Sequence, residues 1–169
     1  MPDAIITGTA LGCLGDTEKF LSAIIADDEQ FLTPTSFIQS IQNTVSAQIA
    51  LQLKCMNHNF TFVHKGFSFE SAILDALMML EENEAENILV GGLDEMTEKN
   101  LFIYDRLDLW KKDKIRSTEL YSQNSKGTIS GEGAAFFVLS KNASSKDYAK
   151  LCGIKTIYNP STTEEINSN

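Results

Sequence analysis

Three short apolar runs constrain the fold of this chain more than any other feature of the sequence. They are AIITGTALGC (4–13), NFTFV (59–63) and NILVGGLDE (87–95), and their Ile, Val, Thr and Phe content is typical of buried strands. Stretches with the apolar spacing of helices lie between them, so strands and helices alternate along the chain. That order predicts an α/β domain with a mainly parallel central sheet flanked by helices.

Two of the intervening stretches have clear helical patterns. In residues 36–54 the apolar positions recur every three or four residues, and Ser36 and Gln39 have the spacing of a capping box. These features predict one long helix over 36–54. From Phe69 onward the same periodicity predicts a second helix with one buried face.

The later part of the chain is less regular. Residues 96–126 are polar and are expected to be irregular, and GTISGEGAAFFVLSK (127–141) is a glycine-rich turn leading into a strand. A further strand is expected over 148–160. We expect residues 1–160 to form one domain, because no composition shift marks a boundary, and residues 161–169 to be a flexible tail.

Composition and charge narrow the possible partners. The formal net charge of −9 argues against a nucleic-acid partner, because binding phosphates needs a basic face. No apolar run approaches the roughly 20 residues that span a bilayer, and no signal peptide is visible. We therefore expect cytoplasmic residence.

Cysteine and histidine positions argue against a disulfide framework and a metal site. Cys13, Cys55 and Cys152 are far apart, and their number is odd. His58 and His64 are the only histidines, and no cysteine lies at ligand spacing from either. No metal and no other cofactor is expected.

The stretch FVHKGFSFESAILDA (62–76) has the pattern of a strand that runs into a helix, with Gly66 at the corner. Many α/β enzymes place a nucleophile at such a corner, where backbone amides and the helix dipole assist it. Glycine has no attacking atom, so Gly66 excludes covalent catalysis there. We expect Ser68 to cap the helix. We expect no catalytic role for His64, because a partly exposed histidine at the end of a strand more often has none.

Three other candidate motifs are weak. The GEG sequence at 131–133 lacks both the phosphate-loop pattern and a following helix. Asp94 and Glu95 are adjacent and point apart on regular structure, so they make a poor acid–base pair. The basic segment KKDKIR (111–116) is expected to be a solvated loop, and a docking patch for an acidic carrier is the alternative.

Four segments, taken in order, resemble the N-terminal half of the β-ketoacyl synthases, which have the thiolase fold. The segments are TPTSFIQSIQNTVSAQIA with Pro34 and Asn43, FTFVHKGFSFESAILDA, NILVGGLDE and SGEGAAFFVLSK. Each is weak alone, but together they cover roughly residues 4–158 in the family's order. In the second segment Gly66 stands where the family has its cysteine nucleophile.

The departures from the family are as informative as the matches. The family's two catalytic histidines and its lysine lie in a C-terminal half that this sequence does not contain, and neither His58 nor His64 can replace them. Residues 4–13 match the family's second strand better than its first, which is central to the sheet. A missing central strand would leave backbone groups unpaired unless another segment or a partner fills the gap, or the chain is a fragment.

The resemblance implies a truncated, non-catalytic ketosynthase-like subunit, similar to a chain-length factor. Such a subunit would support acyl-carrier-protein-dependent chain elongation in fatty acid or polyketide biosynthesis, or in aryl polyene or flexirubin-type pigment assembly. The expected partner is a full-length ketosynthase in a heterodimer, or a second copy in a homodimer, with an acyl carrier protein as a further candidate. The residues expected at the interface or acyl tunnel are Phe60, Phe62, His64, Gly66, Phe67 and Phe69.

Two alternatives remain open at this point. One is an active acyltransferase or condensing enzyme that uses Ser68 or Cys55 as its nucleophile, although no base stands at a suitable spacing from either. The other is a stand-alone binding or structural module.

Overall fold

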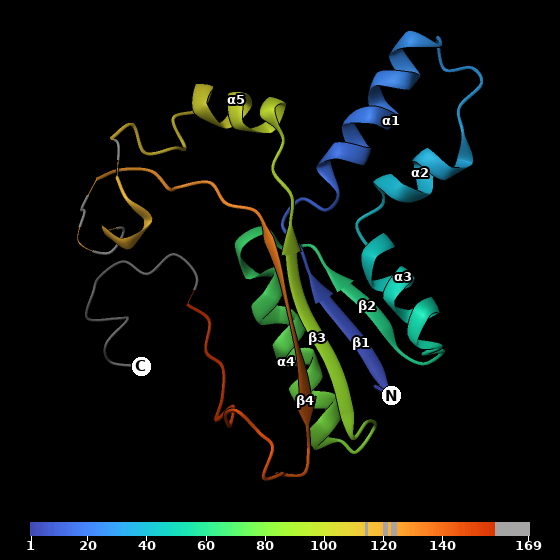
Figure 1. Ribbon diagram of the computed structural model, residues 1–169, viewed down its shortest axis with the longest axis vertical. Helices are drawn as coiled ribbons and strands as arrows, with labels where there is room; N and C mark the ends of the chain where they lie inside the picture. Colours follow the sequence, from blue (N-terminus) through green and yellow to red (C-terminus); the bar gives the residue numbers. More distant parts are fainter. Residues whose placement is uncertain (114, 120–121, 123–124, 158–169) are drawn as a thin grey trace.

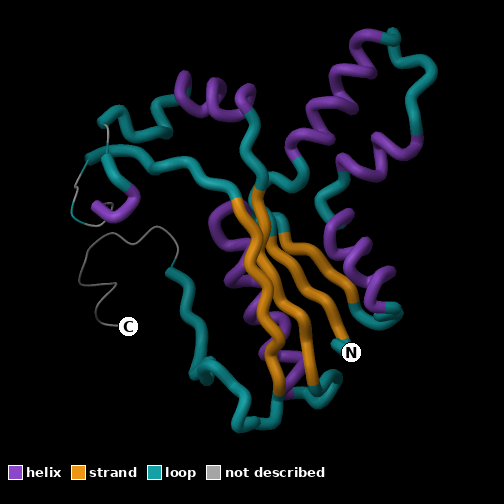
Figure 2. Tube along the Cα trace, viewed as in Figure 1, coloured by secondary structure: helices purple, strands orange, loops and turns teal. Residues whose placement is uncertain are grey.

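A four-stranded sheet forms the centre of the computed structural model, which describes residues 1–113, 115–119, 122 and 125–157 (Figures 1 and 2). The strands are β1 (Ala4–Gly8), β2 (Asn59–Phe62), β3 (Asn87–Asp94) and β4 (Gly133–Ser140). They lie in the order β2-β1-β3-β4, with β1 parallel to both neighbours and β4 antiparallel to β3. The predicted α/β class, with a mainly parallel sheet flanked by helices, is confirmed.

Strand β1 is paired along both of its edges. Ile6 lies opposite Phe60 in β2 on one side and opposite Val90 in β3 on the other. The described sheet is therefore continuous, and no gap separates β1 from β3. The cost of unpaired backbone groups, which a missing central strand would bring, does not arise at this position.

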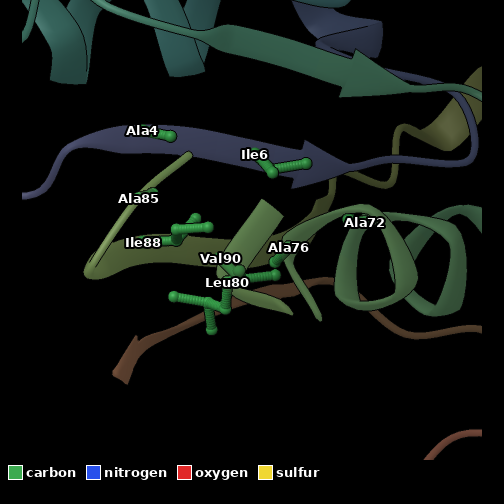
Figure 3. Close-up of a cluster of buried hydrophobic side chains, with 8 residues drawn as sticks. All are labelled: Ala4, Ile6, Ala72, Ala76, Leu80, Ala85, Ile88 and Val90. Atoms are coloured by element: carbon green, nitrogen blue, oxygen red, sulfur yellow. The ribbon is translucent and has the colours of Figure 1, made fainter. Parts of the chain in front are cut away.

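Helix α4 (Ser68–Glu81) covers one face of the sheet and makes the main core with it (Figure 3). Alternate strand residues point toward this helix, which presents alanines where it approaches the sheet most closely. The buried members of this cluster are Ala4, Ile6, Ala72, Ala76, Leu80, Ala85, Ile88 and Val90. Each large side chain buried there contributes about 1.5–3 kcal/mol.

Helix α3 (Thr44–Leu53) covers part of the opposite face, over β1 and β2. Ile5 points to this side and packs with Ala50 of α3 and with Cys55. Val138 of β4 is 62% exposed, so the cover does not extend across the whole sheet.

Three helices lie beyond the carboxyl ends of β1, β2 and β3 (Figure 1). Helices α1 (Leu14–Ala26) and α2 (Pro34–Ser40) form a hairpin that extends away from the sheet, and neither contains a buried residue. Their contact includes the rings of Phe20 and Phe37, whose centroids are 5.6 Å apart. Helix α5 (Glu98–Arg106) is capped by Thr97, whose hydroxyl accepts a hydrogen bond from the Asn100 amide.

The prediction of one long helix over 36–54 is wrong. Helix α2 ends at Ser40, Ile41 has an extended backbone, and α3 begins only at Thr44. The Thr44 hydroxyl and, at 3.3 Å, the Ile41 amide donate to the carbonyl of Ile38, where a continuous helix would have the amide of residue 42. The expected capping box is also absent, because the Ser36 hydroxyl bonds to the Thr33 hydroxyl at 2.7 Å.

Two expectations for the later chain need correction. The segment 96–126, predicted to be irregular, contains α5 and a short 3-10 turn, η2 (Ser117–Glu119). The part of the predicted strand 148–160 that the structure describes, residues 148–157, has no strand. Residues 158–160 and the predicted tail 161–169 lie outside the described residues.

Among the described residues, no helix is both long enough and apolar enough to cross a membrane.

Candidate functional site

An open cleft lies at the carboxyl ends of β1 and β3, where α4 begins. Its volume is about 580 Å³, within the range of small-molecule sites. Four segments contribute to it: the end of β1, the turn before α4, the end of β3 and the start of β4. The lining residues are Gly8, Thr9, Ala10, Lys65, Gly66, Ser68, Phe69, Glu70, Gly92, Leu93, Asp94, Gly133, Ala134 and Ala135.

Gly66 lies in a 3-10 turn, η1 (Lys65–Phe67), that joins β2 to α4. A Cβ atom added at Gly66 would meet no heavy atom within 4 Å. The left-handed backbone of this turn belongs to Lys65, with φ of 55°, and not to Gly66. Neither space nor backbone conformation therefore requires glycine at position 66.

The prediction that Ser68 caps α4 is wrong. Ser68 is the first residue of the helix, no side chain makes a cap hydrogen bond there, and the residue is only 3% exposed. Its hydroxyl lies 2.8 Å from both the Thr9 and Lys65 carbonyl oxygens and accepts a hydrogen bond from the His64 amide. Ser68 thus ties the end of β1 to the turn before α4.

Neither histidine lines the cleft. The Nδ1 atom of His64 lies 3.2 Å from the Ser71 hydroxyl, which itself donates to the Phe67 carbonyl. The Nε2 atom of His58 lies 3.5 Å from a carboxylate oxygen of Asp75. Both histidines therefore face α4 from the outer strand of the sheet, away from the cleft.

The phenylalanines predicted for the interface or tunnel fall into separate places. Phe69 lines the cleft and packs against Gly92, where an added Cβ would lie 3.2 Å from its ring. Phe60 and Phe62 lie on β2, and Phe60 is 48% exposed while Phe62 packs against the core. Phe67, 37% exposed, follows Gly66 in the turn and does not line the cleft.

Asp94 organises the loop after β1, a role that the sequence did not reveal. One of its carboxylate oxygens accepts hydrogen bonds from the Thr9 hydroxyl and from the amides of Ala10 and Leu11, at 2.8–3.2 Å. The Thr9 hydroxyl in turn accepts from the Gly12 amide. The signal was the position of Thr9 and Asp94 at the ends of parallel strands, where clefts of α/β sheets form.

The cysteines offer no nucleophile to the cleft. Cys55 is buried against Ile5 on the opposite face of the sheet. Burial, followed by the negative charges of Glu95 and Asp16, raises the pKa of the Cys13 thiol, which favours the protonated form. Neither residue lines the cleft.

The basic segment 111–116 is partly neutralised within the chain. Lys111 donates to the carbonyl and hydroxyl of Ser125. Lys112 pairs with Asp105 at 2.8 Å and with Asp108 at 3.4 Å, and its hydrogen bond to Asp105 raises the pKa of Lys112. Lys114 lies outside the described residues. These contacts weaken the hypothesis of a carrier-docking patch.

The parallel strands, the cleft at their carboxyl ends and the turn that leads from β2 into α4 define the class of the molecule as an α/β domain. The β-ketoacyl synthase N-terminal domain family matches residues 3–145, and the chain belongs to this family. No curated protein matches the sequence.

Solved structures with the same fold include ketosynthases. A β-ketoacyl synthase from Burkholderia phymatum STM815 has a TM-score of 0.66 and 18% identity, covering 82% of this chain and 35% of that chain. The ketosynthase ApeO in complex with its chain length factor ApeC from Xenorhabdus doucetiae has a TM-score of 0.53 and 20% identity, and the match covers 63% of this chain and 42% of that chain. A type II acyl carrier protein in complex with its ketosynthase, AntDE:AntF, has a TM-score of 0.64 and 19% identity, and the match covers 82% of this chain and 39% of that chain.

These likenesses show a thiolase-like fold, as predicted. The chain spans only 35–42% of the length of these neighbours.

Proposed function

We propose that this chain is a non-catalytic, ketosynthase-like subunit that acts in the manner of a chain-length factor. The proposal rests on Gly66, which lies in the turn before α4, where the resemblance places the family's nucleophile. The turn and cleft of the site are kept, but the attacking atom is absent.

The geometry around position 66 supports a strand-to-helix corner that has lost its nucleophile. An ordinary turn glycine is kept for a left-handed backbone or for close packing, and neither applies to Gly66. The space is open enough for the side chain that the family carries there. Folding therefore does not account for the glycine at position 66.

The alternative of an active enzyme with another nucleophile is weakened by two contacts. The Ser68 hydroxyl is buried and bonds to two carbonyl oxygens and to the His64 backbone amide, and among the described residues no imidazole nitrogen is its partner. Cys55 lies on the other face of the sheet, away from the cleft. Neither group has a base positioned to activate it.

The outer edge of β2 is the surface that we propose for the partner subunit. It carries Phe60 and Phe62, with His64 two residues beyond its end, and the adjacent helix α4 exposes Leu74 and Met78 by about half. A row of apolar side chains beside an edge strand is a common basis for strand-to-strand association. The partner is a full-length ketosynthase in a heterodimer, or a second copy of this chain.

The biosynthetic pathway and the location in the cell stay predictions. We propose support of acyl-carrier-protein-dependent elongation in fatty acid, polyketide or aryl polyene and flexirubin-type pigment biosynthesis, in the cytoplasm. The neighbours in which a ketosynthase binds a chain length factor or a carrier protein support this in general terms. The functional unit is taken as residues 1–160, of which 3–145 match the family.

The test is the product distribution of a reconstituted ketosynthase. Purified full-length ketosynthase, carrier protein and labelled malonyl groups are combined with the chain or with its Phe67→Ala or Phe69→Leu variants. We expect the wild-type chain to change product length, and a variant that enlarges the acyl path to lengthen the products. Tyr148→Ala, which removes an exposed aromatic ring, is the matched control.

Two outcomes would redirect the proposal. Products that are identical with and without the chain would reject the chain-length role and favour a stand-alone module. Steady malonyl incorporation by the chain alone would instead restore the active-enzyme alternative.

A further inference from the structure

Four aromatic rings form a continuous row along the outer strand. His58 stacks on Phe60 at 6.1 Å, Phe60 meets Phe62 edge-on at 4.9 Å, and Phe62 meets His64 at 5.7 Å. The order His, Phe, Phe, His at alternate positions reads the same from either end and is centred on Thr61. The row lies on the α4 side of the sheet, because Asp75 and Ser71, one helical turn apart, contact its two ends.

This symmetry makes the β2 edge self-complementary. Among the described residues β2 pairs only with β1, so its other edge offers free backbone groups. If a second copy pairs antiparallel in a register centred on Thr61, Phe60 faces Phe62 of that copy. His58 then faces His64 of the second copy, with Cβ atoms about 4.5–5.5 Å apart on the same side of the sheet.

The contact between His58 and Asp75 has the spacing of two ligands on one metal. Nitrogen and oxygen ligands lie about 2.0–2.2 Å from a tetrahedral zinc ion, which places them about 3.4 Å from each other. The observed distance from His58 Nε2 to Asp75 Oδ2 is 3.5 Å. At the other end of the row, Ser71 contacts Nδ1 of His64, so Nε2 is the ring nitrogen that can serve as a metal ligand.

We propose that, when two copies of this chain pair through the β2 edge, the strand that the resemblance places at the subunit interface, a zinc-type transition-metal site forms at each end of that interface. Each site takes His58 and Asp75 from one copy and His64 from the other, with water as the fourth ligand. The inference rests on the proposed use of the β2 edge as a subunit interface.

A site of this kind cannot form within one copy. Within the described residues of a single chain, no three His, Cys, Asp or Glu side chains lie close enough together to hold a metal. His58 and His64 stand at opposite ends of the ring row, with two phenylalanines between them. The sequence-based expectation of no metal concerned one chain, and the two-fold arrangement is what brings the ligands together.

The symmetry gives a sharp complementation test. In a dimer of His58→Gln, both sites lack one ligand, and the same holds for His64→Gln. In a mixed dimer of the two variants, one end has lost both histidines, while the other end has His58 and His64 intact. Mixing two defective proteins should therefore restore one site per mixed dimer.

The experiment uses the full chain, stripped with a chelator and titrated with Zn²⁺ by calorimetry, with Co²⁺ absorption and sedimentation as further readouts. We expect one zinc per chain, dimers that tighten with zinc, and a tetrahedral cobalt spectrum. Each single variant should lose zinc affinity by at least about tenfold. Random exchange makes half of the dimers in the mixture mixed dimers, so the mixture should recover at least one tight site per four chains. Asn57→Ala, at an exposed neighbour of His58, should bind as wild type.

Two results would overturn the inference. One is a mixture that binds no more zinc than either variant alone. The other is full binding by each single variant, which would indicate adventitious surface histidines. A chain that binds no zinc but still changes ketosynthase products would overturn only the metal site, and zinc-dependent dimers that never change ketosynthase products would overturn only the proposed function.

Discussion

Gly8 and Gly66 lie on the same cleft, yet they are glycines for opposite reasons. Gly8 ends β1 where α4 begins, and an added Cβ would lie 2.4 Å from the carbonyl carbon of Ser68. At Gly66 the same addition would meet nothing within 4 Å. The first glycine is required by packing and the second is not, so position 66 is free to vary without cost to the fold.

The largest effect is expected at Gly8. Gly8→Ala would force the backbone of α4 away from the end of β1, since backbone atoms, not a flexible side chain, occupy the space. We expect a loss of about 3 kcal/mol in the free energy of unfolding, measured by urea denaturation. Gly131→Ala, where an added Cβ also meets nothing within 4 Å, is the control. Equal stability of the two variants would contradict the claim that packing requires glycine at position 8.

A smaller loss is expected at Gly91 in β3. An added Cβ would lie 2.1 Å from the Phe136 ring, but a side chain can move where a backbone cannot. We expect Gly91→Ala to cost about 1–2 kcal/mol. Combining it with Phe136→Ala should cost less than the sum of the two single changes. Strict additivity in this double-mutant cycle would contradict the contact.

Replacing Lys65 with glycine should stabilise the chain. Lys65 holds a left-handed backbone with φ of 55°, which costs a non-glycine residue about 1 kcal/mol. We expect Lys65→Gly to raise the midpoint of urea unfolding accordingly. A lowered midpoint would mean that the lysine side chain has a structural contact that outweighs the strain.

The smallest change in stability is expected at Gly66. Gly66→Cys should alter the free energy of unfolding by less than about 0.5 kcal/mol, because the space is open and the backbone is ordinary. With the three native cysteines replaced, the new thiol should react readily with an alkylating reagent, since position 66 is exposed. A cost above about 2 kcal/mol would show that glycine is kept there for folding.

Much of the core could be predicted from the sequence. The four strands at 4–8, 59–62, 87–94 and 133–140 lie within predicted strand segments, and α4 follows the predicted periodicity from Phe69. These segments combine β-branched or helical patterning with one buried face, so local preference and packing agree.

The sequence-based predictions of helices and strands fail where local patterns compete with tertiary contacts. The break at Ile41 depends on the Thr44 hydroxyl reaching Ile38, which apolar periodicity does not reveal. Helix α5 was missed although Thr97 offered a cap, because its residues are largely polar. The apolar positions of 148–157 resemble a strand, but no neighbouring edge pairs with them in the described residues.

The candidate site was only partly predictable for the same reason. Gly66 at the corner was visible in the sequence, but its open surroundings, the left-handed Lys65 and the loop held by Asp94 all depend on distant segments. The pairing of His58 with Asp75 across 17 residues also has no signature in the sequence.

The central claim is that the chain is a silent subunit of a ketosynthase, and mass measurement of a complex tests it most directly. The chain is co-expressed with a full-length, cysteine-containing ketosynthase encoded near it and purified with a chelator present, so that zinc-linked self-pairing does not compete. Size-exclusion chromatography with native mass analysis should give a one-to-one complex that Phe60→Glu abolishes. A well-folded chain that elutes apart from every such ketosynthase would contradict the account.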